Sequence, residues 1–108
     1  MPRISVIMSV YKEPVDWIRQ SIDSILEQSF CDFEFIIVND NPTRELNEQV
    51  LNAYIQKDSR IRVLNNEANI GLTKSLNRAL SISRGEYIAR MDADDISSPE
   101  RLKKQVEF

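Results

Sequence analysis

The sequence contains no histidine, a single cysteine and only two glycines among its 108 residues. Without histidine, a Ser-His-Asp catalytic triad and a histidine-ligated zinc site are both excluded. Cys31 has no second cysteine to pair with, so an internal disulfide and a paired-thiol redox motif are excluded as well. Gly71 and Gly85 cannot supply the glycine-rich phosphate loop of dinucleotide-binding or P-loop proteins. A phosphate bound by this chain must therefore be neutralised in another way.

Positive charge is also scarce, because 14 basic residues stand against 17 acidic ones and the net charge is −3. Aromatic residues make up only 7%, so we expect neither nucleic acid nor an anionic membrane surface as a direct partner. No apolar run approaches the length of a membrane span, and the N-terminus lacks a basic region followed by an apolar core. We therefore expect a cytoplasmic protein with one small globular domain.

Four apolar or β-branched runs predict strands, and the first two predict strands that are buried in the sheet. These runs are Ile4–Val10, Phe33–Asp40, Arg60–Asn66 and Glu86–Met91. Between and after them, apolar residues recur at the spacing of helices. These residues are Val15, Ile18, Ile22, Ile25 and Leu26, then Leu46, Val50 and Tyr54, then Leu72, Leu76, Ala79 and Leu80, and finally Leu102 and Val106.

Residues that start or stop helices mark the ends of these helical segments. Pro14 suits a first helical turn, and Thr43 is a suitable cap for the second helix. Gly85 is placed as the stop of the third helix, and Ser97-Ser98-Pro99 opens the last one. Strand and helix thus alternate four times, which predicts an α/β fold with a Rossmann-like, doubly wound and mostly parallel sheet, of which this chain forms half.

In a doubly wound sheet, ligands bind beyond the carboxyl ends of the strands. Tyr11 and Asp40 fall there, together with the acidic stretch from Asp92 to Asp95. Tyr11 could stack on a planar base or could pack as a half-buried aromatic residue. Asp40 could accept a hydrogen bond from a base edge or could serve only as a turn residue. A nucleotide laid across these strand ends would meet all of them.

The acidic stretch needs a positive partner, because like charges about 4 Å apart repel by about 4 kcal/mol at an effective dielectric constant near 20. Asp95, just ahead of the last helix, can interact with the helix dipole, but this accounts for one carboxylate only. A calcium-binding EF-hand loop fails at Ser97 and Lys103, where glycine and glutamate are needed. Asp92 and Asp94 suit Mg²⁺ or Mn²⁺ that also binds water and phosphate oxygens. Such an ion would neutralise a diphosphate in place of a glycine-rich loop.

At this point the chain resembles the family 2 glycosyltransferases, which have the GT-A fold. The resemblance rests on four blocks in series, "ISVIMSVYKE", "FEFIIVND", "NIGLTKSLNRAL" and "GEYIARMDADD". It implies a nucleotide-sugar donor, most often a UDP-sugar, inversion at the anomeric carbon, and a saccharide or lipid-linked acceptor in bacterial surface polysaccharide synthesis. It also implies peripheral association of the full-length enzyme with the inner face of the membrane.

The same resemblance implies roles for individual residues. Tyr11 would stack on the base and Asp40 would bind the uracil N–H. Asp92 and Asp94 would form the Asp-any-Asp motif that contacts ribose, metal and diphosphate, with Asp94 in direct contact with the metal. Lys74 is a candidate for the base or the diphosphate, with a solvated lysine as the alternative.

The sequence departs from the family pattern after the second strand. Asn39-Asp40 stands where two acids are usual, and Asn41-Pro42 stands where Gly-Ser is usual, which affects the shape of that loop. Family members extend well past Phe108, and that further part supplies the acceptor site and the catalytic base, an Asp or Glu. We therefore expect residues 1–108 to be the single donor-binding part of a catalytic domain, truncated at the C-terminus. It would bind donor and metal but transfer no sugar by itself.

Two other functions remain open. A receiver-like signalling module also binds Mg²⁺ at strand ends, but it needs an acidic pair where this chain has "SVYKEP" and a phosphate-accepting Asp where it has "NNEAN". The second alternative is a non-catalytic interaction domain that retains Asp92 and Asp94 without using them for sugar transfer.

Overall fold

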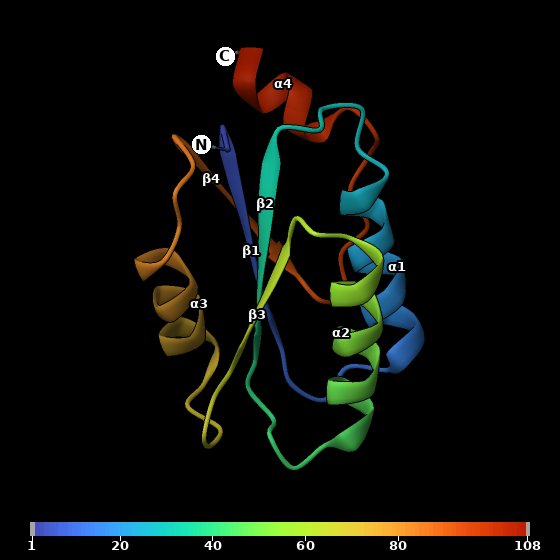
Figure 1. Cartoon of the computed structure of the whole chain (residues 1–108), viewed down its shortest axis with the longest axis vertical. Helices are drawn as coiled ribbons and strands as arrows, with labels where there is room; N and C mark the ends of the chain where they lie inside the picture. Colours follow the sequence, from blue (N-terminus) through green and yellow to red (C-terminus); the bar gives the residue numbers. More distant parts are fainter. Residues whose placement is uncertain (1, 108) are drawn as a thin grey trace.

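The computed structural model describes residues 2–107 and confirms the predicted alternation of strands and helices (Figure 1). The strands are β1 (Ile4–Val10), β2 (Phe33–Asn39), β3 (Ile61–Asn65) and β4 (Tyr87–Asp92). The helices are α1 (Val15–Leu26), α2 (Glu45–Lys57), α3 (Leu72–Ser81) and α4 (Arg101–Glu107). The strand ends differ from the predicted ones by at most one residue, which is within the usual uncertainty of element boundaries.

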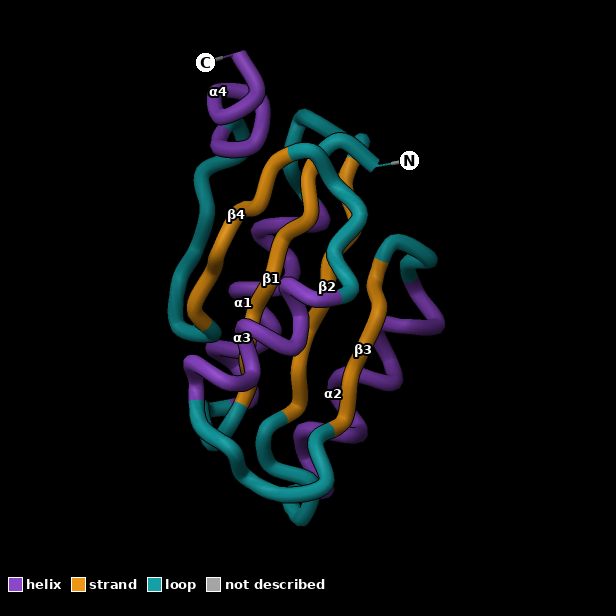
Figure 2. The backbone as a smooth tube through the Cα atoms, turned by 90° about the vertical axis from the view of Figure 1, so that its left-hand side faces the viewer, coloured by secondary structure: helices purple, strands orange, loops and turns teal. Residues whose placement is uncertain are grey.

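The sheet is parallel and has the strand order β3-β2-β1-β4, which Figure 2 shows edge to edge. The chain adds strands in one direction from β1 to β3 and then returns to place β4 on the other side of β1. The gap between β1 and β4 is therefore the switch point of the sheet, where doubly wound proteins bind ligands. Ser9 and Asp92 are paired there in the strand register.

Helices cover both faces of the sheet, as expected for strands with continuous apolar runs. Helices α1 and α2 lie on one face and α3 lies on the other (Figures 1 and 2). The larger core includes Ile18, Phe35 and Leu102, so α4 joins the side of α1 and α2. The smaller core joins Leu76 and Ala79 of α3 to the sheet. Within residues 2–107, none of the helices has the length and apolar character needed to cross a bilayer.

Two predicted helix boundaries are wrong. Thr43 does not cap α2, because its hydroxyl donates to Asn41 Oδ1 at 3.3 Å and the helix begins at Glu45 without a side-chain cap. Gly85 does not stop α3, which ends at Ser81. Gly85 is instead a site of close approach, since a Cβ atom there would lie 2.5 Å from the backbone nitrogen of Ser5.

The last helix also begins later than predicted. Pro99 lies in the turn before α4 rather than in its first helical turn, and the N–H of Arg101 donates to the carbonyl of Ser98 at 3.1 Å. Asp95 is therefore six residues ahead of α4 and outside its first turn, where the helix dipole acts most strongly.

Three leucines of the predicted apolar stripes are about half exposed, namely Leu46, Leu72 and Leu80. Their spacing is helical, as predicted, but α2 and α3 each contact the sheet through a narrower face than the stripe. Apolar spacing therefore located these helices correctly and overestimated how much of each is buried.

Candidate functional site

A cavity of about 290 Å³ opens at the carboxyl ends of β1 and β2, beside the switch point. It contains Tyr11 and Asp40, two of the residues that the sequence places at this edge. The full lining is Ser9, Tyr11, Glu13, Asp40, Asn69, Gly71 and Leu72. The fold therefore brings together residues from the segments after β1, after β2 and before α3.

Tyr11 combines a fixed backbone with an open ring. Its N–H donates to Glu13 Oε1 at 2.7 Å, and its carbonyl accepts from Asn47 Nδ2 at 2.8 Å. The residue is 39% exposed, and Lys12 Nζ lies 5.7 Å from the ring centroid. The ring can therefore offer a face to a planar ligand without rearrangement of the main chain, and its stacking on a base stays a prediction.

Asp40 is 2% exposed and anchors the segment that leads into α3. Its Oδ1 accepts from Asn66 Nδ2 and from the N–H of Ile70, both at 2.8 Å. Its Oδ2 accepts from Asn69 Nδ2 at 2.8 Å and from the N–H of Gly71 at 3.0 Å. A carboxylate has about four lone-pair sites, and all of them are occupied here. Binding of a base by Asp40 stays a prediction that must account for these bonds.

Sequence reasoning did not find this anchoring role, although Gly71 gives a signal of it. Gly71 has a φ of +93°, which side chains other than glycine rarely adopt, and it stands at the N-cap of α3. This conformation accompanies the N–H bond from Gly71 to Asp40. Lys74 follows in the first turn of α3 and is exposed, but it does not line the cavity, and its contact with a ligand stays a prediction.

Asn39, which stands where the family usually has an acid, is 2% exposed and joins three elements. Its Oδ1 accepts from Asn47 Nδ2 and from the N–H of Asn41, both at 3.1 Å. Its Nδ2 donates to Asn65 Oδ1 at 3.2 Å. A carboxylate could not donate this last bond. The amide therefore suits the site, and it helps to hold the loop that begins at Asn41.

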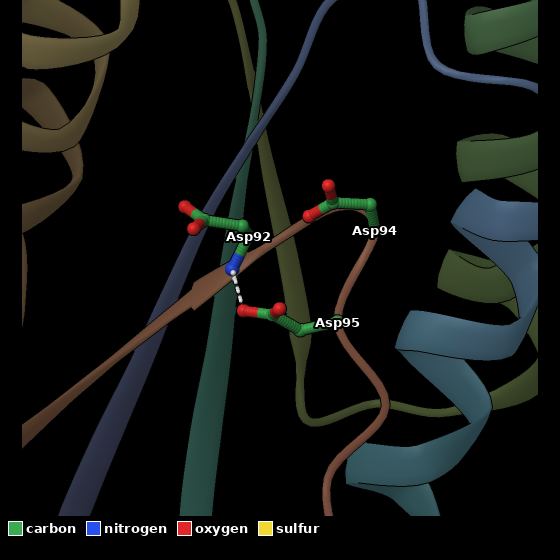
Figure 3. Close-up of side chains that lie close together, drawn as sticks. All are labelled: Asp92, Asp94 and Asp95. Atoms are coloured by element: carbon green, nitrogen blue, oxygen red, sulfur yellow. Dashed lines mark hydrogen bonds between the residues drawn. The ribbon is translucent and has the colours of Figure 1, made fainter.

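The carboxylates of Asp92, Asp94 and Asp95 gather around the turn that follows β4 (Figure 3). One oxygen from each can be chosen so that all lie within 4.8 Å of one another. Arg90 Nη2 lies 3.5 Å from Asp92 Oδ1, and both side chains are about half exposed. Because Asp92 pairs with Ser9 in the sheet register, this cluster lies beside the cavity.

Within the cluster, Asp95 closes the turn through the main chain. The N–H of Asp92 donates to Asp95 Oδ2 at 3.1 Å, shown as the dashed line in Figure 3. In return, the N–H of Asp95 donates to the carbonyl of Asp92 at 3.0 Å. Among residues 2–107, the carboxylate of Asp92 has only the 3.5 Å contact with Arg90, and the carboxylate of Asp94 has no hydrogen bond. Their exposed oxygens are the kind of ligand that Mg²⁺ and Mn²⁺ prefer, so the donor set fits such an ion, and the assignment of Asp92 and Asp94 as ligands stays a prediction.

Comparison with known proteins identifies the family. The sequence profile of glycosyl transferase family 2 matches residues 5–108, nearly the whole chain. The chain belongs to glycosyl transferase family 2. Membership in this family removes the receiver-like signalling module from consideration.

Relatives in family 2 are similar along the whole chain. An uncharacterised glycosyltransferase of Methanocaldococcus jannaschii is 48% identical over 107 residues, which are 99% of this chain and 37% of that protein. TuaG, a Bacillus subtilis glycosyltransferase named for teichuronic acid biosynthesis, is 37% identical over 99% of this chain and 42% of its own length. The chain thus spans well under half the length of these relatives.

A solved structure of the family confirms the GT-A fold. The S. aureus protein TarS, residues 1–349 in complex with UDP-GlcNAc, superposes with a TM-score of 0.86 and 30% sequence identity. The match covers 97% of this chain and 30% of the TarS chain. The α/β architecture predicted from the sequence is therefore shared with glycosyltransferases of known structure.

Proposed function

We propose that this chain is the donor-binding part of an inverting glycosyltransferase that uses a nucleotide-diphosphate sugar, a UDP-sugar, with Mg²⁺ or Mn²⁺. The observation that carries this proposal is the cavity with Tyr11 and Asp40 lying directly beside the exposed carboxylates of Asp92 and Asp94. A base in the cavity would place its diphosphate toward those carboxylates. The complex of TarS with UDP-GlcNAc supports the choice of donor.

For the base, Tyr11 supplies a stacking face and Asp40 a hydrogen-bond acceptor. Since every lone-pair site of Asp40 is already used, a base N–H must take over one of the four places. Asn69 is the donor that yields, because its amide comes from an exposed residue that itself lines the cavity. The two backbone donors stay in place and keep the segment before α3 fixed. Lys74, at the start of that helix, would then face the diphosphate.

For the diphosphate, Asp92 and Asp94 would hold the divalent ion, and Asp95 would fix the turn that carries them. The ion supplies neutralisation of the negative charge that grows on the departing diphosphate. The acceptor hydroxyl oxygen forms a bond to the anomeric carbon while the bond from that carbon to the diphosphate oxygen breaks. The hydroxyl proton passes to a carboxylate of the longer protein, which acts as the general base. This single displacement inverts the anomeric carbon.

For the longer protein, we propose a cytoplasmic enzyme at the inner face of the membrane. Its acceptor would be a saccharide or lipid-linked saccharide of a bacterial surface polysaccharide. The teichuronic acid role in the name of TuaG supports this part of the proposal. The alternative is a non-catalytic interaction domain, and the same binding experiment separates the two.

The proposal is tested by thermal unfolding of the chain with UDP and Mg²⁺. A ligand that binds only the folded state increases the free energy of unfolding by mass action, by about 2.7 kcal/mol at one hundred times its Kd. The Tm rises as a result. We expect EDTA to remove most of this rise and Tyr11→Ala to weaken UDP binding, with Tyr11→Phe as the matched control that keeps the ring. A Tm that does not respond to UDP with either Mg²⁺ or Mn²⁺ contradicts the proposal and favours the interaction domain. Sugar transfer by the chain alone would contradict the assignment of the base to the longer protein.

A further inference from the structure

A second hollow, of about 200 Å³, lies on the other side of the acidic turn, between α1 and the segment that follows β4. Its walls are Trp17 and Gln20 from α1, and Asp94 and Ile96 from the segment after β4. None of the binding roles described above uses Trp17, Gln20 or Ile96.

The hollow is built on a rigid frame. Ser21 Oγ donates to the carbonyl of Ala93 at 2.8 Å, and the N–H of Ser97 donates to Ser24 Oγ at 3.0 Å. Both serines are buried on α1, so the helix holds the segment that carries Asp94 at two points. The two walls therefore keep their spacing in the absence of a ligand.

Trp17 is not part of the core, although it stands on a helix with a fully buried apolar side. Ile18 and Ile22 are 0% exposed, whereas Trp17 is 50% exposed and Ile96 is 67% exposed. Trp17 and Gln20 are three residues apart, which places them on the same face of α1. An indole face, a primary amide and a carboxylate thus surround one small hollow.

This combination fits a sugar ring. A pyranose has an apolar face of C–H groups and a rim of hydroxyls. An aromatic ring can cover the first while amide and carboxylate groups bind the second. Small-ligand sites show the same mixture of apolar lining and a few convergent polar groups. The groove between α1 and α2, which contains Leu46, is comparably apolar but has no residue of the acidic turn in its lining.

We propose that Trp17, Gln20 and Ile96 form a subsite for a pyranose ring next to Asp94. This rests on the proposed function, because Asp94 is also assigned there to the metal and diphosphate. The ring can come from the donor or from the acceptor, and the same contacts serve either.

Trp17 is the single tryptophan of the chain, so selectively excited tryptophan emission reports on this hollow. The chain would be titrated with UDP, with UDP-glucose, UDP-galactose and UDP-GlcNAc, and with free glucose and N-acetylglucosamine in the presence of UDP. Mg²⁺ is the ion of choice, since it is not paramagnetic and does not quench the indole. A response to a UDP-sugar that exceeds the response to UDP supports the subsite with a donor ring. A response to a free sugar supports it with an acceptor ring.

If no saccharide probe changes the emission, the subsite is overturned, whether or not UDP binds. The proposed function is judged separately, by the Tm response to UDP with Mg²⁺. If UDP raises the Tm but no sugar changes the emission, the subsite is contradicted and the donor site is supported. If UDP leaves the Tm unchanged while a free sugar changes the emission, the subsite is supported and the proposed donor site is contradicted.

A variant pair gives a second measurement by calorimetry. Trp17→Ala should raise the Kd of the responding sugar ligand by about threefold to tenfold, which corresponds to the loss of one aromatic contact. The Kd of UDP should change by less than about twofold. Trp17→Phe should recover part of the loss because it restores a ring face. Leu46→Ala is the matched control, since Leu46 is equally exposed at 50% and lies outside the hollow. Equal losses for UDP and for the sugar ligand in Trp17→Ala overturn the subsite.

Discussion

The acidic turn after β4 and Glu34 at the amino end of β2 treat their carboxylates in opposite ways. At the carboxyl end, Asp92, Asp94 and Asp95 form a cluster of exposed oxygens, with Arg90 at 3.5 Å from Asp92 as a loose cationic neighbour. At the amino end, Glu34 is 4% exposed and is surrounded by donors from the chain. The same chemical group is thus satisfied inside the fold at Glu34 and left open in the turn after β4.

The contacts of Glu34 show what full satisfaction requires. Its Oε2 accepts from Ser5 Oγ and from the N–H of Arg84, both at 2.6 Å, and its Oε1 accepts from Arg62 Nη1 at 3.1 Å. Burial by itself raises the pKa of Glu34, but these hydrogen bonds outweigh burial and hold its pKa below the ordinary value of 4.5. Ser5 Oγ also accepts from the N–H of Gly85 at 2.8 Å. Glu34 therefore ties the connection between α3 and β4 to the sheet.

The difference separates stability from function. A buried carboxylate with chain partners contributes to the folded state, whereas an exposed cluster is repulsive until a cation from outside joins it. Substitution of Glu34 should therefore change unfolding, and substitutions of Asp92 and Asp94 should change ligand binding.

The largest effect is expected for Glu34→Ala. It removes the acceptor of Ser5, Arg62 and the backbone N–H of Arg84, and we expect a loss of about 2–4 kcal/mol in the free energy of unfolding. Urea denaturation measures this loss. Glu86→Ala, at an exposed neighbouring acid, is the control and should stay within about 0.5 kcal/mol. Similar losses of unfolding free energy in Glu34→Ala and Glu86→Ala would contradict a special stabilising role of Glu34.

The pH dependence of stability gives the next largest effect. Because the pKa of Glu34 is lower in the folded state than in the unfolded state, its contribution is fully present above the unfolded value and is lost as the pH falls through the folded one. Urea unfolding should therefore show stability that falls as the pH drops below the ordinary glutamate pKa of 4.5. Glu34→Gln should flatten part of this decline. An unchanged slope in Glu34→Gln would show that other carboxylates dominate, among them Asp58, whose pKa the hydrogen bond from Arg60 lowers.

A smaller change in stability and a large change in binding are expected for Asp94→Ala. Asp94 is exposed, so the free energy of unfolding should stay within about 0.5 kcal/mol. The Mg²⁺-dependent part of the Tm rise with UDP should disappear. Glu100→Ala, at an exposed acid outside the cluster, should keep the full rise. Unfolding of Asp94→Ala would instead show a structural carboxylate at this end too.

The smallest effect separates Asp95 from its neighbours. Asp95→Asn keeps an oxygen that can accept from the N–H of Asp92, so metal-dependent UDP binding should change little. Asp95→Ala loses that bond, worth about 1 kcal/mol, and should weaken binding about fivefold. Titration calorimetry with Mg²⁺ and UDP measures both, with Asp94→Asn as the comparison. If Asp95→Asn weakens binding as much as Asp94→Asn does, Asp95 contacts the ion directly.

Strand and helix identity could be predicted here because burial on both faces leaves a local trace. Ile4–Val10 is a nearly continuous apolar run, and its seven residues are all buried in β1. The Gly85 prediction failed because a glycine after a helix looks the same whether it caps the helix or, as here, lets the chain approach Ser5. That contact joins residues 80 positions apart, and spacing along the chain carries no information about it.

The site could be predicted only in part. Tyr11 and Asp40 were placed at one edge of the sheet from strand ends alone, and the structure puts them in one cavity. The occupied oxygens of Asp40 could not be predicted, because they depend on the path of residues 66–71 in space. Trp17 lies outside the apolar stripe predicted for the first helix, and the hollow that it lines could not be predicted, because that hollow depends on how α1 packs beside the segment after β4.

The amino-acid sequence by itself determined the order of elements, the family and the strand ends at which polar residues gather, because side-chain periodicity and local turn chemistry act over a few residues. Only the tertiary structure decided which carboxylates are satisfied and which are open. That outcome depends on how many donors from distant segments reach each oxygen: four converge on Asp40 and three on Glu34, whereas the side chain of Asp94 remains exposed beside Trp17.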